Sequence, residues 1–288
     1  MNKTIFLYNI IGWLFFLSSE PIPQIRQEVQ KESSAYSRVE IKDTELRTIK
    51  SKYVAQDYKI NIFFPKDYEE EGKRYPVIYV LDAEYNFGCV AYIARRLMKN
   101  EDIPKVLLVG IAYNTDYEDF YDKRFRDSTP VSRIHGRNSG GAEQFTQFIE
   151  KELIPFINRN FKTIPEDRTL VGHSITGFYC FYALFRHPGL FDRYIVVSPS
   201  LWFSGGIVFE YEEAFSSNHK DISGFVYLSV GGEESQRMRE GSTKLNDTLL
   251  KRGYSHLKFK FSLVEGENHR SLFPYAFSRG LRFVFSNE

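Results

Sequence analysis

Arg168-Thr-Leu-Val-Gly-His-Ser-Ile-Thr-Gly177 is the most informative stretch of this sequence. Its apolar residues Thr169 to Val171 are typical of a short buried strand, a glycine then permits a sharp turn, and Phe178 to Phe185 is typical of an apolar helix. A serine between a strand end and a helix start exposes its hydroxyl at the edge of the sheet. The next N–H group lies at the positive end of the helix dipole. The turn therefore predicts a nucleophile, Ser174, and one oxyanion donor, the N–H of Ile175.

This turn departs from the usual nucleophile elbow at one position. Such elbows carry small residues two places before and two places after the nucleophile, because the helix must lie against the strand. Gly172 meets the first requirement, but Thr176 occupies the second position and Gly177 comes one place late. A branched side chain there could shift the helix and misplace Ser174. Taken alone, the stretch is equally compatible with a strand–turn–helix corner that carries no chemistry.

Apolar runs on both sides of the turn predict the other strands of a sheet. Continuous runs are typical of strands that helices cover on both faces. They occur at Tyr75–Leu81 and Val106–Ile111, and further strands are predicted at Tyr194–Val197, Phe225–Val230 and Leu257–Val264. Helical patterns separate them at Tyr85–Lys99, Ala142–Arg159 and Thr243–Arg252. Strands that alternate with helices predict an α/β fold with a mostly parallel central sheet and helices on both faces.

The N-terminal part of the folded region has a different pattern. Arg38–Ile41, Lys50–Val54 and Tyr58–Phe64 alternate polar and apolar residues, as antiparallel strands with one buried face do. Thr115–Gly141 is a long polar segment, rich in aromatic residues and without regular periodicity. We expect it to be an irregular connection that is functional or mobile.

The first 19 residues are expected to lie outside the fold. Lys3 precedes the apolar run Ile5–Leu17, which is too short to span a bilayer comfortably and is typical of a signal-peptide core. The residues after it are a poor cleavage site, so an uncleaved membrane anchor is the alternative. Residues 20–35 have a linker composition, which leaves 36–288 as the folded domain. We therefore expect an exported protein, periplasmic or secreted.

Composition excludes several classes of function. The 288 residues carry a net charge of only +1, so nucleic acid is not an expected partner. Two cysteines, Cys89 and Cys180, exclude a disulfide framework and a cysteine-rich metal site. No metal-ligand cluster or phosphate-binding glycine loop occurs, so neither a metal nor a cofactor is expected. Aromatic residues make up 16% of the chain, and filling the core is their commonest use.

Polar residues that follow the predicted strands supply candidate partners for Ser174. In parallel sheets the functional residues lie beyond the carboxyl ends of the strands. Glu233 and Glu234 follow one such strand and His269 follows the last one, which gives the order serine, acid, histidine used by α/β-hydrolases. His269 is the candidate base. We favour Glu234 over Glu233 as the carboxylate that orients it, whereas His173 is expected to have a packing role.

The same reasoning places the remaining site residues. Asp82-Ala-Glu-Tyr85 follows an early strand, and the N–H of Glu84 is the expected second oxyanion donor. Tyr85 and Trp202 are the expected substrate-binding residues. Trp202 is equally compatible with an ordinary place in an aromatic core.

Taken in order, these residues resemble a known family of α/β-hydrolases, the esterases related to esterase D and to the siderophore trilactone esterases. The resemblance covers about Tyr36 to Phe285. It rests on Tyr75-Pro-Val-Ile-Tyr-Val-Leu-Asp82, Arg126-Asp-Ser-Thr-Pro130, Glu152-Leu-Ile-Pro155, Gly172-His-Ser174, Ser198-Pro-Ser-Leu-Trp202, Ser229-Val-Gly231 with Glu234, and His269.

The resemblance implies carboxylic-ester hydrolysis through an acyl-enzyme, with Ser174, Glu234 and His269 as a catalytic triad. It also implies an oxyanion-hole role for the Glu84 amide and a place beside the substrate for Trp202. Group members act on siderophore lactones, on feruloyl or acetyl esters of carbohydrates, on S-formylglutathione, or as acyltransferases. The expected partner is a small-molecule or carbohydrate ester, and contact with a membrane is expected only through an uncleaved N-terminal segment. The alternatives are an acyltransferase and a non-catalytic binding protein with the same fold.

Overall fold

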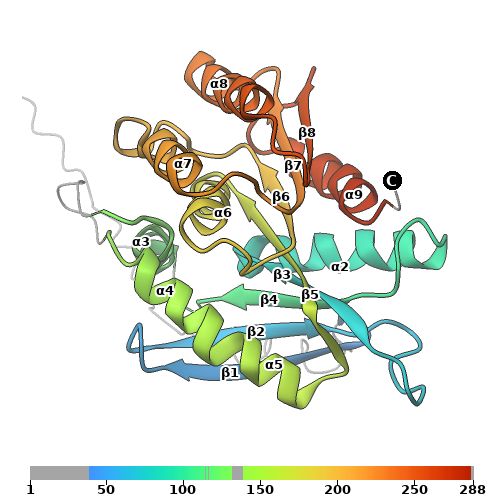
Figure 1. Ribbon diagram of the computed structural model, residues 1–288. Coiled ribbons are helices and arrows are strands. Elements are labelled where there is room, and N and C mark those ends of the chain that lie inside the picture. The colour runs from blue at the N-terminus through green and yellow to red at the C-terminus, as the bar shows by residue number, and fades with distance from the viewer. Residues whose placement is uncertain (1–38, 114, 116, 132–138, 287–288) are drawn as a thin grey trace, which may run out of the picture. The chain divides into compact units, whose positions relative to one another are not determined.

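The computed structural model describes residues 39–113, 115, 117–131 and 139–286. Within these residues the strands form one sheet in the order β1-β2-β4-β3-β5-β6-β7-β8 (Figure 1). The strands are β1 (Thr44–Ser51), β2 (Gln56–Phe63), β3 (Tyr75–Val80), β4 (Leu107–Ala112), β5 (Thr163–His173), β6 (Arg193–Val197), β7 (Gly224–Gly231) and β8 (Leu257–Val264). The helical elements are α2 (Ala83–Lys99), α3 (Tyr117–Ser128), α4 (Ala142–Phe148), the π turn η1 (Ile149–Leu153), α5 (Ile154–Asn160), α6 (Ile175–Arg186), the 3-10 turn η2 (Phe203–Gly205), α7 (Ile207–Asn218), α8 (Gln236–Arg252) and α9 (Leu272–Val284).

Strand pairing confirms the predicted α/β fold. β1 pairs with β2, and β2 with β4, in antiparallel fashion, while all other neighbouring strands are parallel. β5 lies between β3 and β6, with Val171 opposite Val80 and Ile195. The strand that leads to Ser174 is therefore central in the parallel part of the sheet.

The predicted limits of the first strands were wrong. Residues 39–41 and 52–55 lie outside any strand, and the single strand between them is Thr44–Ser51. Val39 and Ile41 are exposed. Residues 52–55 instead form the turn of a hairpin, because β1 must reverse there to pair with β2.

The prediction of an irregular connection over Thr115–Gly141 was also wrong in part, because α3 occupies its first half. Its second half includes residues outside the described part of the chain. The helix predicted over Ala142–Arg159 is present, and the π turn η1 interrupts it before Pro155. α6 and α8 both begin earlier than the apolar pattern indicated, and the sequence reading had no counterpart for α7.

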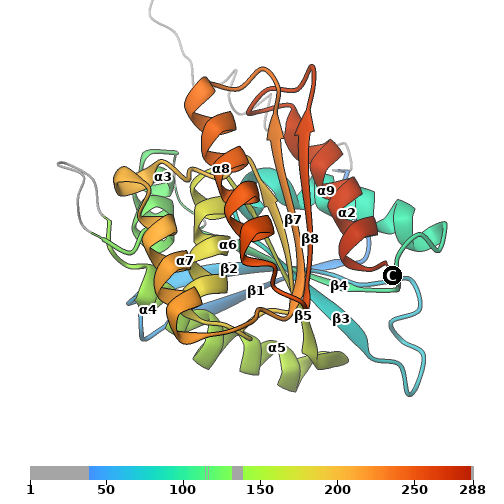
Figure 2. The same cartoon turned by 45° about the horizontal axis from the view of Figure 1, so that its top comes forward.

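Helices lie on both faces of the sheet (Figure 2), and an apolar layer fills the space on each face. Side chains alternate across each strand: in β3, Val77 and Tyr79 join one layer while Ile78 and Val80 join the other. Helices α2 and α9 cover one face and contact each other, and α4 to α8 cover the other face. Many of the largest fully buried side chains are Tyr and Phe, so the core absorbs much of the aromatic excess.

The N-terminal predictions lie outside the described residues. These are the signal peptide or anchor over 1–19 and the linker over 20–35, and they stay predictions. Residues from Lys42 to Glu288 form a unit of their own, which holds every site residue discussed below. Among the described helices, none is both long and apolar enough to cross a membrane.

Candidate active site

Ser174 sits on a strained turn between β5 and α6. Its backbone has φ 63° and ψ −118°, a conformation that L-residues rarely adopt. Three backbone hydrogen bonds fix it: its N–H donates to Val197 O at 3.0 Å, and its carbonyl accepts from the N–H groups of Ser200 at 2.9 Å and Phe178 at 3.0 Å. A Cβ at Gly172 would lie 2.3 Å from the Thr176 carbonyl oxygen, so only glycine permits this approach of helix and strand.

Thr176 is accommodated within the elbow by hydrogen bonds. Its Oγ1 accepts from the N–H of His173 at 2.9 Å and lies 2.9 Å from Asp82 Oδ2. Gly177, one place later, provides the close contact on the other side, because a Cβ there would lie 3.1 Å from Val197 O. The branched residue therefore leaves α6 packed against the strand, contrary to the shift that the sequence alone made a concern.

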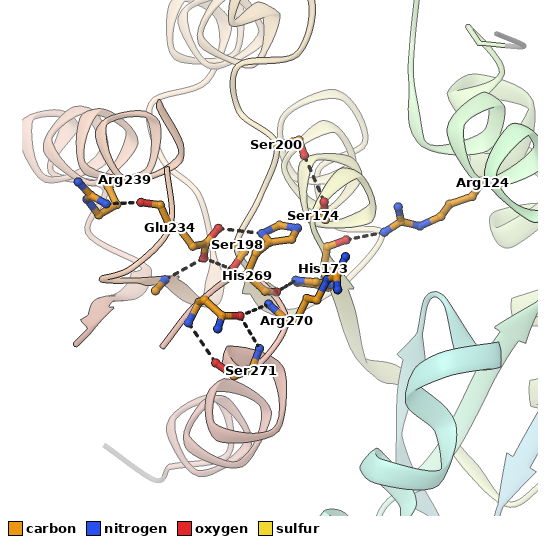
Figure 3. Close-up of polar contacts among 12 residues, drawn as sticks. Arg124, His173, Ser174, Ser198, Ser200, Glu234, Arg239, His269, Arg270 and Ser271 are labelled. Carbon is orange, nitrogen blue, oxygen red and sulfur yellow. Dashed lines mark hydrogen bonds and ion pairs between the residues drawn. The ribbon is translucent and has the colours of Figure 1, made fainter. Parts of the chain in front are cut away.

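Glu234 and His269 form a hydrogen-bonded pair at the ends of β7 and β8. Glu234 Oε2 lies 2.8 Å from His269 Nδ1 (Figure 3). The other oxygen, Oε1, accepts from Ser198 Oγ at 2.5 Å and from the N–H of Gly231 at 2.9 Å. The Glu234 carboxylate is buried, which acts to raise its pKa, but these hydrogen bonds together hold that pKa below its ordinary value. The carboxylate is therefore ionised and fixed in orientation.

The adjacent acid is placed differently. Glu233 is exposed, and its backbone N–H donates to Glu267 O at 3.0 Å. The structure thus brings Glu234, and not Glu233, to His269. Glu234 is also the carboxylate favoured from the sequence, where the choice between the two acids was close.

His173 packs against His269. The two ring centroids are 4.6 Å apart, and His173 Nε2 lies 2.8 Å from the carbonyl oxygen of His269 (Figure 3). Burial, together with the positive charge that His269 can carry, lowers the pKa of His173 to about 4. His173 is therefore neutral near pH 7 and donates its Nε2 proton to that carbonyl, in agreement with the packing role expected for it.

Ser174 and His269 line the same cavity of about 490 Å³. Its other lining residues are aromatic or polar: Asp82, Tyr85, Asn86, Phe120, Tyr121, Arg124, His173, Arg270 and Phe273. Ser174 Oγ lies 3.4 Å from Ser200 Oγ, and among the described residues no hydrogen bond joins it to His269 (Figure 3). Catalytic hydrogen bonds are often long or absent without substrate and form in the complex, so this geometry is compatible with proton transfer between them.

The two predicted oxyanion donors lie at helix starts. Ile175 is the first residue of α6, where an N–H has no partner within the helix, and Glu84 is the second residue of α2. The Glu84 carboxylate accepts from the N–H of Tyr113. Both amides lie beyond the carboxyl ends of neighbouring strands, as expected from sequence.

The two predicted substrate-binding residues differ. Tyr85 lines the cavity, with its ring edge-to-face on Phe120 at 5.0 Å. Trp202 is 37% exposed and is absent from the described lining of that cavity. The Arg237 guanidinium covers its ring at 4.1 Å. Trp202 is therefore an exposed side chain two residues beyond Ser200 and not part of an aromatic core.

Sequence reasoning missed Arg124, Ser198 and Ser200 as contributors to the site. Ser198 and Ser200 belong to the Ser198–Trp202 motif and could have been found from their position at the end of a strand. Arg124 lies on α3, in the segment for which no helix was predicted, so nothing in the sequence placed it near Ser174. In the part of the chain that the structure describes, no group of three or more His, Cys, Asp or Glu side chains could hold a metal ion.

Comparisons with known proteins identify the family of this chain. A family model described as "Putative esterase" matches residues 51–275, well over half of the chain. The chain belongs to this family of esterases. It is a carboxylic ester hydrolase, and this assignment disfavours the non-catalytic binding protein considered from sequence.

Two curated relatives and one crystal structure illustrate the family. Ferri-bacillibactin esterase BesA of Bacillus subtilis is 34% identical over 265 residues, covering 85% of this chain and 90% of the relative. The siderophore triacetylfusarinine C esterase of Aspergillus fumigatus is 28% identical over 263 residues, covering 81% and 90%. The crystal structure of BES protein from Bacillus cereus has a TM-score of 0.80 and 32% identity, covering 87% of this chain and 98% of that one.

Proposed function

We propose that this esterase works through an acyl-enzyme on Ser174, with His269 as general base and Glu234 as the carboxylate that orients it. The observation that carries the proposal is the Glu234–His269 hydrogen bond of 2.8 Å beside the strained Ser174. Because Nδ1 of His269 is engaged by Glu234, Nε2 is the nitrogen left to accept a proton from the serine.

The chemistry follows from these positions. Ser174 Oγ forms a bond to the ester carbonyl carbon while its proton passes to His269 Nε2. The N–H groups of Ile175 and Glu84 are the proposed donors to the resulting oxyanion. Collapse breaks the bond to the alcohol, which leaves with the proton from His269. Water, deprotonated by His269, then releases the acid and restores the serine.

We further propose that the substrates are siderophore esters, with feruloyl or acetyl esters of carbohydrates as the alternative. The named relatives act on ferri-bacillibactin and triacetylfusarinine C, which supports the first class. The aromatic lining residues Tyr85, Phe120 and Phe273 suit a flat or apolar acyl group. The N-terminal sequence supports export, so we propose that hydrolysis takes place outside the cytoplasm.

Purified protein should be tested against bacillibactin and triacetylfusarinine C, with and without iron, and against feruloyl and acetyl-xylan esters. We expect hydrolysis of a siderophore ester and a loss of about 10⁴-fold or more in kcat for Ser174→Ala. An organophosphonate should label wild-type protein at Ser174 and leave Ser174→Ala unlabelled. Hydrolysis unchanged by Ser174→Ala would refute the nucleophile. Hydrolysis of carbohydrate esters alone would refute the siderophore assignment.

A further inference from the structure

Arg124, which lies on the side of Ser174 away from Glu234 (Figure 3), forms a buried ion pair with Asp82. Arg124 Nε and Nη2 donate to the two carboxylate oxygens of Asp82 at 2.7 and 2.8 Å. Arg124 Nη2 also donates to the carbonyl oxygen of His173 at 3.0 Å, next to the nucleophile (Figure 3). Asp82 is 4% exposed, so the pair is largely shielded from water. A two-pronged pair of this kind fixes direction as well as distance.

Thr176 connects this pair to the elbow. Its hydroxyl oxygen lies 2.9 Å from Asp82 Oδ2 and 2.9 Å from His173 O, and it accepts the His173 N–H. The hydroxyl has one proton. We assign it to Asp82, because a carboxylate is the stronger acceptor and the His173 carbonyl already receives Arg124. The elbow is therefore held to Asp82 both through Thr176 and through Arg124.

Asp82 also fixes the start of α2. It is the N-cap residue, with φ 56°, and its carbonyl accepts from the N–H groups of Tyr85 and Asn86 at 3.1 Å each. Glu84, the proposed second oxyanion donor, lies inside this turn. The proposed first donor, Ile175, lies between Ser174 and Thr176. One carboxylate thus joins the two separate chain segments that carry the two donors.

We propose that Thr176, Asp82 and Arg124 form a positioning network that sets the distance between the two oxyanion donors. This inference rests on the proposed function and extends it. Thr176 occupies the position where an elbow ordinarily needs a small residue. Its hydroxyl makes hydrogen bonds to Asp82 and His173 that glycine could not make. Oxyanion donors must lie close to the reacting oxygen, and small displacements cost large factors in rate.

The test compares Thr176→Val, which keeps the shape and removes the hydroxyl, with Thr176→Ser, which keeps the hydroxyl. We expect Thr176→Val to lower kcat by about 10- to 100-fold with KM changed by less than about threefold, because only transition-state stabilisation is lost. Thr176→Ser should stay within about threefold of wild type in kcat. The pH profile should keep its shape in both variants, since Glu234 and His269 are untouched.

Thr146→Val is the matched control. Thr146 is also a buried threonine on a helix, and its hydroxyl bonds Ala142 O at 2.8 Å and Tyr179 Oη at 2.7 Å, away from the cavity. It should lose stability like Thr176→Val and keep its kcat. Equal kcat in Thr176→Val and Thr176→Ser, or an equal fall in Thr146→Val, would overturn the network.

Arg124→Lys provides a second test where Thr176→Val does not fold. It keeps the charge and removes the two-pronged geometry, and we expect kcat to fall by at least about tenfold. An unchanged kcat would also overturn the proposal. Failure of the proposed function is distinguishable, because Ser174 would then resist phosphonate labelling and Ser174→Ala would keep the hydrolysis of wild type.

Discussion

Two buried carboxylates, Asp82 and Glu234, lie on different sides of Ser174 and are held in different ways. The oxygens of Asp82 are bound by Arg124, which is always charged, and by a threonine hydroxyl. Those of Glu234 are bound by His269, whose charge changes when it takes a proton, and by two neutral donors. The first arrangement is permanent, whereas the second can respond to a proton.

This difference suits the two sides to different tasks. A carboxylate paired with a permanent cation stabilises a geometry and gains nothing when a proton moves. A carboxylate paired with a histidine stabilises the imidazolium at the moment when it forms. Substitutions at Asp82 should therefore act mainly on folding and positioning, and substitutions at Glu234 mainly on the chemical step.

The largest effect is expected from Glu234→Gln. An amide cannot stabilise the imidazolium and favours the wrong tautomer of His269, so kcat should fall about 10⁴-fold while the protein stays folded. Steady-state kinetics on a chromogenic ester would measure this. Glu233→Gln, at the exposed neighbour, is the control and should be close to wild type. A larger loss in the control would reverse the assignment of the acid.

Asp82→Asn should instead act on stability. It leaves the Arg124 guanidinium buried against a neutral amide, and we expect the free energy of unfolding to fall by about 3–5 kcal/mol in urea titrations. Asp102→Asn is the control, because its pair with Arg282 at 2.9 Å is more exposed and should contribute less than about 1 kcal/mol. Similar losses in both variants would remove the distinction drawn for Asp82.

The dependence of stability on pH should come from His173, whose ring packs against His269. The pKa of His173 is about 4 in the folded protein, below the ordinary value of about 6.5 in the unfolded chain. The unfolded chain therefore binds more protons between these values. The stability from neutral His173 is complete above about pH 6.5, and about 2 kcal/mol of it is lost by pH 5. The free energy of unfolding of wild type should fall by about 2 kcal/mol more than that of His173→Asn between pH 6.5 and pH 5. An equal fall in both proteins would contradict the lowered pKa of His173.

The smallest effect is expected at Ser198, which supports Glu234 from behind. Ser198→Ala removes one of three hydrogen bonds to the carboxylate, and we expect about a tenfold loss in kcat, corresponding to about 1.4 kcal/mol. Ser229→Ala is the control, because the Ser229 hydroxyl is buried and has no hydrogen-bond partner among the described residues. It should retain full activity. Equal losses of kcat in Ser198→Ala and Ser229→Ala would show that the hydrogen bond from Ser198 to Glu234 does not support catalysis.

The sequence predicted the Glu234 side of the site better than the Asp82 side. Ser174, Glu234 and His269 each follow a strand of a parallel sheet, so the strand pattern alone brought them to one edge. Arg124 follows no strand. Its place depends on packing between α3 and the elbow, and such tertiary contacts leave no periodic signal in the sequence.

The same limit applies to the errors in the fold. β1 was misplaced because Arg38–Ile41 alternates as a strand would, although Val39 and Ile41 are exposed. α3 was missed because its residues are charged and aromatic rather than apolar on one face. The expectation that Thr176 could shift the helix rested only on the volume of its side chain. Its hydroxyl has partners on other segments that local sequence cannot reveal.

The positive φ angle of Ser174 implies a conflict between the stability of the fold and catalysis. A residue with a Cβ at that position carries a standing penalty of roughly 1–3 kcal/mol, which glycine would largely avoid. Ser174→Gly should therefore melt at a higher temperature than wild type. If random variants at position 174 are selected only for resistance to heat, Ser174→Gly should become enriched, although it lacks the nucleophile.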